Sequence, residues 1–481
     1  MPRAELLRLC LTSRLTLLSL VGLGAVLRVC GSLDEFYLDE IWSLRTVLGV
    51  SSPVDLLTQP HHDNLHILNS LFLWLVQDGR NWVLYRSLSV ASSIGLLLLA
   101  ATWARPHLLA PVVPAVALLS CSYPLIVYGS EARGYAPATL AGLAALVLVD
   151  RIGESGRDRR TLLMLWGTLF LGMLSHLSFA FVIVSLAALT AARSWRLEPG
   201  VRALLPALGA RFGVPLALSA LVYVPYILST TIGGGQRLGV AQVVRDWLTL
   251  SCGPREGGMA WLVAGIALAV LAGETAAEFR EGDARWAFSA TVLTLPPLTL
   301  LVLQPSVLGV RYLIVTTPFL ILMLARALGR AASRGLPGRS LAGLAFAAML
   351  FGNGARLQPF LTIGRGHYRE AVAFIRARTP GPEATVASDH DFRNRMMLWF
   401  YAPPTPGLKP LVYTSISHPL EGGTEWLITH SLDRAPRVPE RRTVGNVTYR
   451  LAYTAPYFGE LSGFHWYVYR RLETGTSLAA P

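Results

Sequence analysis

The sequence is poor in charge and almost without lysine. Only 15% of its 481 residues are charged, whereas a typical water-soluble domain has about 25%. Lys409 is the single lysine, and 53% of the residues are hydrophobic. This scarcity of charge excludes an ordinary soluble globule. Repeated apolar runs of about 17 to 20 residues predict a polytopic membrane protein instead.

Cysteine is also scarce, and the chain has no internal repeat and no low-complexity tract. The four cysteines, Cys10, Cys30, Cys121 and Cys252, include no pair at CxxC spacing, so a zinc or redox motif of that kind is excluded. Cys30 and Cys252 are both expected outside the membrane, and a disulfide between them remains open. Cysteine usage therefore bounds the redox compartment only weakly.

The net charge of +13 comes almost entirely from arginine. These arginines cluster between apolar runs and do not follow one soluble face, so membrane topology explains them better than a nucleic-acid partner does. The first apolar stretch resembles a secretory signal, but it is long and no small-residue cleavage site follows it. It is therefore predicted to remain as the first span.

About eleven spans are predicted, with the N-terminus in the cytoplasm because Arg3, Arg8 and Arg14 precede the first of them. They lie near 14–31, 83–103, 108–128, 135–150, 161–192 (a hairpin of two), 213–231, 259–273, 286–303, 311–326 and 339–355. "HILNSLFLWLVQ" is too short to cross at about 12 residues, and it is expected to lie along the interface in the first outer loop. The odd number of spans places the C-terminus outside.

The composition changes near residue 356. "HYREAVAFIRARTP" has helical apolar spacing, and "ATVAS", "LVYTS", "EWLITHS", "NVTYRLAY" and "WYVYRRL" have the pattern of short strands,. The sequence thus predicts a transmembrane module over 1–355 and a small extracytoplasmic α/β domain over 356–481.

Polar residues gather on the predicted outer side. They are Asp39, Glu40, His61, His66, Glu131, Arg133, Tyr135, His176, Arg311 and Tyr312. Ionisable groups are costly at membrane depth, so several apolar helices that end in such groups indicate a site at the interface.

Five segments that are spread along the chain resemble segments of the GT-C membrane glycosyltransferases. They are similar above all to the branch of protein O-mannosyltransferases and the lipid A aminoarabinose transferase. "YLDEIWSL" looks like the family's Asp-Glu signature, and "YGSEARGYA" like its Glu-Ala-Arg-Pro-Tyr segment, with Gly134 in place of the usual proline. "HDNLHILNSLFLWLVQ" resembles the second juxtamembrane helix, "VLGVRYLIV" the Arg-Tyr-Leu segment before a late span, and "HYREAVAFIRARTP" the start of the appended domain. Their order and spacing carry the resemblance.

The resemblance implies a transferase that takes a sugar, such as mannose or arabinose, from a polyprenyl-phosphate donor on the extracytoplasmic side. Most members of the branch invert the anomeric centre and need no metal. The acceptor would be a hydroxyl of a glycan, a glycolipid or a protein.

Elementary chemistry suits these residues too. A hydroxyl acceptor needs a base for its proton, and the leaving phosphate needs cationic stabilisation, for which the planar fork of arginine is well shaped. We therefore expect Asp39 to act as the base and Glu40 to orient the acceptor or the loop. Arg133 and Arg311 would hold the phosphate. The remaining residues would line the pocket or donate hydroxyls: His61, His66, Glu131, Tyr135, His176 and Tyr312.

Several alternatives stay open. Asp39 and Glu40 are also good residues for the start of a helix, and Arg133 and Arg311 can simply extend toward lipid headgroups. The spacing of His62 and His66 permits a metal site, although no cofactor is favoured. At the level of function, the rival is a flippase or transporter of lipid-linked sugar precursors. The absence of a repeat and the position of the polar residues at span ends favour the enzyme.

Overall fold

The computed structural model describes residues 3–58, 61–62, 64, 66–77, 81–107, 112–155, 158–231, 238–253, 257–415, 423–433 and 436–472. The chain divides into two compact units. Unit 1 comprises Met1–Ser32, Val47–Gln77 and Val83–Leu357. Unit 2 comprises Leu33–Thr46, Asp78–Trp82 and Gln358–Pro481, so it contains part of the first outer loop as well as the C-terminal region.

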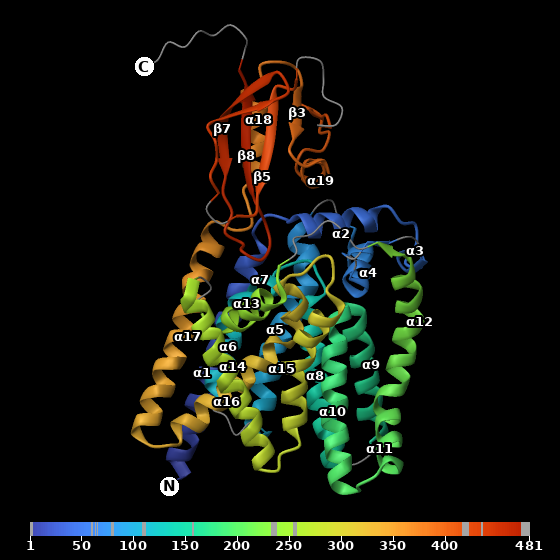
Figure 1. Ribbon diagram of the computed structural model, residues 1–481, viewed down its shortest axis with the longest axis vertical. Coiled ribbons are helices and arrows are strands. Elements are labelled where there is room, and N and C mark those ends of the chain that lie inside the picture. The colour runs from blue at the N-terminus through green and yellow to red at the C-terminus, as the bar shows by residue number, and fades with distance from the viewer. Residues whose placement is uncertain are drawn as a thin grey trace. The chain divides into compact units, whose positions relative to one another are not determined.

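Unit 1 is built from long apolar helices that run side by side (Figure 1). Its helices are α1 (Arg3–Ser32), α5 (Trp82–His107), α6 (Val112–Cys121), α7 (Tyr123–Gly129), α8 (Tyr135–Ser155), α9 (Arg159–Ser175), α10 (Ala180–Leu197), α11 (Val201–Leu208), α12 (Val214–Ser229), α13 (Val240–Cys252), α14 (Gly257–Arg280), α15 (Arg285–Leu303), α16 (Thr317–Ala332) and α17 (Leu336–Thr362). Short helical turns η1 (Leu177–Phe179), η2 (Gly209–Gly213) and η3 (Val310–Thr316) join or extend them.

The helices confirm a multi-pass membrane protein. In the described part of the chain, nine helices are long and apolar enough to cross a membrane, or ten if the bent pair α6–α7 forms one span. The difference from eleven arises in the 161–192 hairpin, where α9 has only 17 residues. A helix of that length rises about 25 Å, which is short of a hydrocarbon core of about 30 Å.

The bend between α6 and α7, 56° in size, follows from the sequence. Pro124 has no N–H to donate to Ser120, and the amide of Tyr123 donates to Asn353 Oδ1 at 2.9 Å,. Two carbonyls are thereby freed inside the helix bundle. Arg28 of α1 donates to both of them, to Ser120 O at 3.2 Å and to Leu119 O at 3.1 Å. Both freed carbonyls are therefore hydrogen-bonded, as membrane depth demands of the main chain.

The first outer loop folds into short elements, which are α2 (Leu38–Leu48), α3 (Asp55–Thr58), β1 (His61–His62) and α4 (Ile67–Val76). β1 pairs in parallel with β2 (Thr230–Thr231). As predicted, the "HILNSLFLWLVQ" segment forms a short apolar helix of ten residues, α4.

Unit 2 contains a six-stranded mixed sheet, which confirms the predicted α/β character. Its helices are α18 (Tyr368–Arg378) and α19 (Asp391–Tyr401), and its strands are β3 (Ala384–Ser388), β4 (Leu411–Tyr413), β5 (Trp426–Ser431), β6 (Arg441–Val444), β7 (Val447–Ala455) and β8 (His465–Arg471). The strand order is β4-β3-β5-β8-β7-β6, with β3 parallel to β4 and β5 and the other pairs antiparallel. Strand β6 was not predicted. It joins β7 through a two-residue turn whose Gly445 has φ 58°, a conformation that suits glycine.

The core of unit 2 is aromatic, and the polar tips of its rings are satisfied. The indole of Trp426 donates to Thr379 Oγ1 at 2.8 Å, and that of Trp466 donates to Asn394 Oδ1 at 2.7 Å. The buried hydroxyl of Tyr368 donates to the Phe464 carbonyl at 3.0 Å. Such pairing removes the cost of burying a polar group, so α18 and α19 are held firmly against the sheet.

Candidate active site

The predicted polar residues of unit 1 meet where α8 begins. Arg133, 3% exposed, lies just before that helix. Its guanidinium donates to Asn64 Oδ1 at 2.5 Å and to the Tyr135 hydroxyl at 3.3 Å. The main chain at this point is held from two other helices, because Asn69 of α4 donates to Ala132 O at 2.6 Å and Ser89 of α5 donates to Arg133 O at 2.8 Å. Arg133 is thus fixed by three separate segments.

Two histidines and two tyrosines surround the guanidinium. The ring centroids of His66 and His176 are 4.9 Å apart, and Tyr135 lies 5.1 Å from the first and 4.8 Å from the second. Tyr128 of α7 packs on Tyr135 at 4.6 Å. We call Arg133, His66, His176, Tyr135 and Tyr128 the ring cluster.

Both histidines of the ring cluster are neutral at physiological pH. Burial lowers the pKa of His66 well below its usual value, and the positive charge of Arg133 lowers it further. The same causes lower the pKa of His176 to about 3. His176 uses Nδ1 to accept from the Ser178 amide at 3.0 Å, whereas Nε2 of His66 is buried and has no hydrogen-bond partner in the part of the chain that the structure describes. This atom is available to a ligand.

The structure gives a reason for glycine at position 134, where the resembled segment has proline. A Cβ atom at this position would collide with the carbonyl of Ser175 and would come within 3.0 Å of His66 Nδ1. Proline carries a Cβ as well, so this backbone approach requires glycine. The close approach brings the start of α8 onto the α9–η1 junction, where His176 lies.

Arg311 and Tyr312 stand at the start of the candidate span Val310–Ala332. The guanidinium carbon of Arg311 is 5.7 Å from the centroid of the Tyr312 ring. Its positive charge contributes to the lowered pKa of both His66 and His176, so Arg311 acts on the same electrostatic site. Glu131 is buried beside Arg133, whose amide donates to the Glu131 carbonyl at 2.8 Å.

The structure says less about His61. Its backbone belongs to β1 and pairs with Thr230, but its side chain lies outside the described residues. The same holds for the alternative metal site, since the side chains of His62 and Asp63 are not described either. Among the side chains that are described, no three of His, Cys, Asp or Glu group in a way that could hold a metal ion. Cys30 and Cys252 are free thiols, so the disulfide left open above is not formed.

Asp39 and Glu40 belong to unit 2, in the first turn of α2. Glu40 is buried, and its carboxylate accepts from the Tyr37 amide at 3.0 Å. This is the reciprocal half of a capping box, which fixes the start of the helix. Glu40 therefore fixes the first turn of α2. Asp39 is half-buried, and the hydroxyl of Ser43 donates to its main-chain carbonyl at 2.9 Å.

Two other acids of this loop, Asp34 and Glu35, bind residues near the start of α18. Asp34 accepts from the Arg365 amide at 2.6 Å and pairs with the Arg365 guanidinium at 3.3 Å. Glu35 accepts from the amides of Tyr368 and Arg369 at 2.5 and 3.0 Å, so it caps the N-terminus of α18. Burial raises the pKa of Glu35 to about 7, in opposition to these amide hydrogen bonds.

Aromatic packing completes these contacts. Phe36 packs on Phe400 at 5.3 Å, and the hydroxyl of Tyr401 donates to the Phe36 carbonyl at 2.7 Å. Trp42 of α2 meets Phe392 of α19 edge-on at 4.9 Å. The segment with Asp39 is thus an integral part of unit 2. We call Asp34, Glu35 and Phe36 the loop anchor.

Comparison with known proteins gives a likeness of fold. No protein-family model and no curated protein sequence matches the chain. The crystal structure of ArnT from Cupriavidus metallidurans bound to undecaprenyl phosphate matches with a TM-score of 0.50 and 13% identity, over 96% of this chain and 99% of that one. The chain has an ArnT-like fold.

Two further structures are similar. The apo state of the same ArnT matches with a TM-score of 0.50 and 14% identity, over 82% of this chain and 85% of that one. The Archaeoglobus fulgidus oligosaccharyltransferase, tethered with an acceptor peptide, matches with a TM-score of 0.46 and 11% identity, over 86% of this chain and 68% of that one. The ArnT-like fold confirms the likeness to GT-C membrane glycosyltransferases that the loop motifs predicted.

Proposed function

We propose that this protein is a membrane glycosyltransferase. It moves a sugar from a polyprenyl-phosphate-linked donor to a hydroxyl acceptor on the extracytoplasmic face, and it inverts the anomeric centre. The observation that carries the proposal is the ring cluster, in which Asn64 and Tyr135 hold the guanidinium of a buried arginine beside two neutral histidines. The ArnT-like fold supports it, because ArnT itself binds undecaprenyl phosphate.

The ring cluster suits a phosphate that gains charge during the reaction. When the bond between the anomeric carbon and the phosphate oxygen breaks, the bonding electrons stay with the lipid phosphate. Arg133 donates to this oxygen in two directions, and Arg311 adds a second positive charge. Both donors are in place before the reaction, so they stabilise the developing charge without reorganising. Neutral His66 offers Nε2 to a hydroxyl of the sugar or to the phosphate.

Asp39 takes the acceptor proton in this proposal. The acceptor oxygen attacks the anomeric carbon from the side opposite the phosphate, its proton passes to the Asp39 carboxylate, and polyprenyl phosphate leaves. A leaving phosphate needs no general acid, in contrast to the sugar oxygen that leaves in a glycosidase. Glu40 and the loop anchor position Asp39. The proposal requires Asp39 and Arg133 to reach one substrate.

The decisive experiment supplies membranes that contain the Asp39→Asn variant with radiolabelled polyprenyl-phosphate sugar and endogenous acceptor. We expect transfer to fall at least about 100-fold, because a positioned base contributes about 10²- to 10⁴-fold. Asp55→Asn is the matched control. This acid of the same loop accepts from the Ser52 amide at 2.8 Å, and its loss should leave transfer nearly unchanged. Full activity of Asp39→Asn would remove Asp39 from the mechanism.

The flippase alternative has one feature in its favour, the bent helix pair α6–α7, since transporters often use broken helices. However, the freed carbonyls of this bend are occupied by Arg28, so they do not await an ion. Purified protein in vesicles separates the two functions. A transferase consumes the lipid-linked sugar when acceptor is present, whereas a flippase only moves it between leaflets.

A further inference from the structure

Unit 2 has a cavity of about 460 Å³ along one face of α18. Arg369 and Arg376 of that helix line it, together with Lys409 from the segment that follows α19. Tyr401, Val372 and Leu408 provide much of the remaining wall. The cavity thus combines cationic and apolar surface, and we call it the α18 groove.

The three cations of the α18 groove are held by main-chain carbonyls and an aromatic ring. Arg376 donates from Nε to the Lys409 carbonyl at 3.0 Å and from Nη2 to the Pro403 carbonyl at 3.4 Å. The ammonium of Lys409 donates to the Thr379 carbonyl. The guanidinium of Arg369 lies over the ring of Trp82, 4.5 Å from its centroid. Among the described residues, no carboxylate forms an ion pair with any of the three, and no acid lines the groove.

Holding three like charges around one cavity is unfavourable unless an anion joins them. The groove offers both planar guanidinium groups and a compact ammonium group as donors, and this combination fits phosphate oxygens. Leu408, half-exposed at 50%, presents apolar surface next to these donors. An occupant that satisfies both parts carries a phosphate-class anion on an apolar body.

We propose that the α18 groove binds the phosphate-class head group of an amphiphilic acceptor. Naming the occupant an acceptor rests on the proposed function; binding of an anionic amphiphile does not. The position within unit 2 favours this role, because Tyr401 in the groove wall also donates to the Phe36 carbonyl at 2.7 Å. The Arg369 amide, moreover, donates to Glu35. The groove and the loop anchor are thus in direct contact, so a molecule in the groove is bound by the same unit that carries Asp39.

The test measures binding directly, with the full-length protein in nanodiscs of phosphatidylcholine. Hexyl phosphate is the probe, hexyl glucoside the neutral amphiphile of equal chain length, and inorganic phosphate the head group alone. Calorimetric titration gives the Kd of each. We expect hexyl phosphate to bind at least tenfold more tightly than the other two. The double variant Arg376→Gln with Lys409→Gln should weaken its binding at least tenfold.

Two further variants guard against a simple folding defect. Arg369→Gln removes a charge that makes no described side-chain hydrogen bond, and it should also weaken binding several-fold, whereas Arg369→Lys retains most of the affinity. The matched control is Arg378→Gln. Arg378 lies on the same helix but stacks on Phe374, 5.7 Å from its ring centroid, so binding should not change.

Unaltered hexyl phosphate binding in the groove variants would overturn the proposal. So would equal affinity for hexyl glucoside or for inorganic phosphate. A transfer assay adds the acceptor role: Arg369→Gln should raise the KM for acceptor and leave kcat and the KM for donor unchanged. If the unaltered protein transfers no sugar at all, the proposed function fails, while the binding result stands or falls separately.

Discussion

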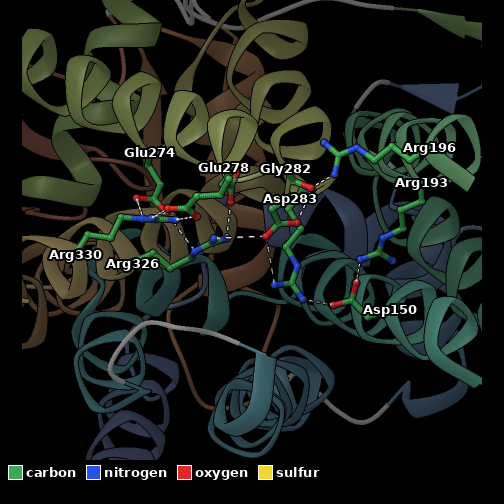
Figure 2. A network of polar contacts seen from close by, with 11 residues as sticks. Asp150, Arg193, Arg196, Glu274, Glu278, Gly282, Asp283, Arg326 and Arg330 are labelled. Carbon is green, nitrogen blue, oxygen red and sulfur yellow. Dashed lines mark hydrogen bonds and ion pairs between the residues drawn. The ribbon is translucent and has the colours of Figure 1, made fainter.

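Arginine is used in opposite ways at the two ends of the membrane helices. At the end away from the ring cluster, arginines and acids form one network across α8, α10, α14, α15 and α16 (Figure 2). Arg326 pairs with Glu274 at 3.2 Å and with Glu278, and Arg330 pairs with Glu274 at 2.9 Å and with Glu281. Asp150 of α8 joins Arg193 at 2.5 Å and Arg285 at 3.3 Å. We call this the ion-pair network.

At the other end, about 22 Å away along α8, the described partners of the Arg133 side chain are an amide oxygen and a phenol. The two histidines there experience a net positive field, because Arg133 and Arg311 both lower the pKa of each of them. In the ion-pair network, by contrast, Arg330 lowers the pKa of Glu281 by direct hydrogen bonding. In the ion-pair network the charges of arginines and acids cancel one another. In the ring cluster the two arginines place a positive field on the histidines.

The difference separates a structural from a functional use of the same side chain. A buried ion pair whose charges cancel holds helices in register. A preorganised cation that is held in place before the reaction can stabilise an incoming anion. We therefore expect substitutions in the ion-pair network to change stability, and substitutions in the ring cluster to change activity.

The largest expected effect is on stability, at Arg326. Arg326→Gln leaves the buried carboxylates of Glu274 and Glu278 partly uncompensated, and removing one partner of a buried pair costs about 3–5 kcal/mol. The yield of folded protein and its thermal unfolding temperature in detergent should both fall. Activity per folded molecule should hardly change. Adding Glu278→Gln removes one of the uncompensated charges and should restore part of the loss. Failure to restore any of it would argue against charge imbalance as the cause.

The next effect is on activity, at Arg133. Arg133→Gln should lower transfer at least about 100-fold, a loss of about 2.7 kcal/mol or more, as for a preorganised donor to a developing oxyanion. Arg133→Lys keeps the charge but loses the two-pronged geometry, so it should recover only part of the rate. Arg193→Gln in the ion-pair network is the control, because Asp150 retains Arg285. Comparable activity losses at Arg133 and Arg193 would erase the contrast between the two ends.

Much of unit 1 could be predicted because membrane depth imposes a strong pattern on the sequence. Apolar runs of span length locate the helices, and arginine clusters mark their ends. The ring cluster was also within reach, since Arg133, Tyr135 and His176 stand at span ends and His66 lies in the polar loop after the first span. Asn64 and Asn69 were not expected as their partners. Amides of this kind have no periodic signature, and only the folded loop shows which backbone or guanidinium they meet.

The loop anchor could not be predicted, and the reason is physical. Asp34 and Glu35 bind main-chain amides more than 300 residues away in the sequence, and amides are present at every residue except proline. An acid near a membrane exit therefore looks the same whether it is solvated or caps a distant helix. Strand β6 was not predicted for a related reason. It is four residues long and mostly exposed, so it has no apolar face to mark it in the sequence.

A smaller effect, on the stability of unit 2, is expected at Glu35. Glu35→Gln keeps the shape of the side chain but turns an NH₂ group toward one amide of α18, which should cost about 1–3 kcal/mol. The raised pKa of Glu35, about 7, means that the folded protein binds an extra proton between pH 4.5 and 7. Its contribution to stability is therefore greatest below pH 4.5 and is lost as the pH rises through 7. Thermal unfolding between pH 5 and 8 should show the deficit of the variant shrinking as the pH rises; a constant deficit would mean that Glu35 does not titrate in this range.

The smallest effect is the pH response of His176, whose pKa is lowered first by burial and then by the charges of Arg133 and Arg311. Its pKa of about 3 lies below the ordinary value of 6.5. Between these two pH values the unfolded chain therefore binds a proton at His176 that the folded protein does not bind. The stability associated with this residue is complete above pH 6.5 and is lost as the pH falls toward 3, by about 1.4 kcal/mol at pH 5.5. His176→Asn retains an acceptor for the Ser178 amide at the helix start and removes this titration. Unfolding temperatures measured from pH 7.5 to 5 should therefore fall less steeply for the variant. Parallel curves would show that His176 takes up its proton in the folded protein at the same pH as in the unfolded chain, so that neither burial nor the two arginines lower its pKa.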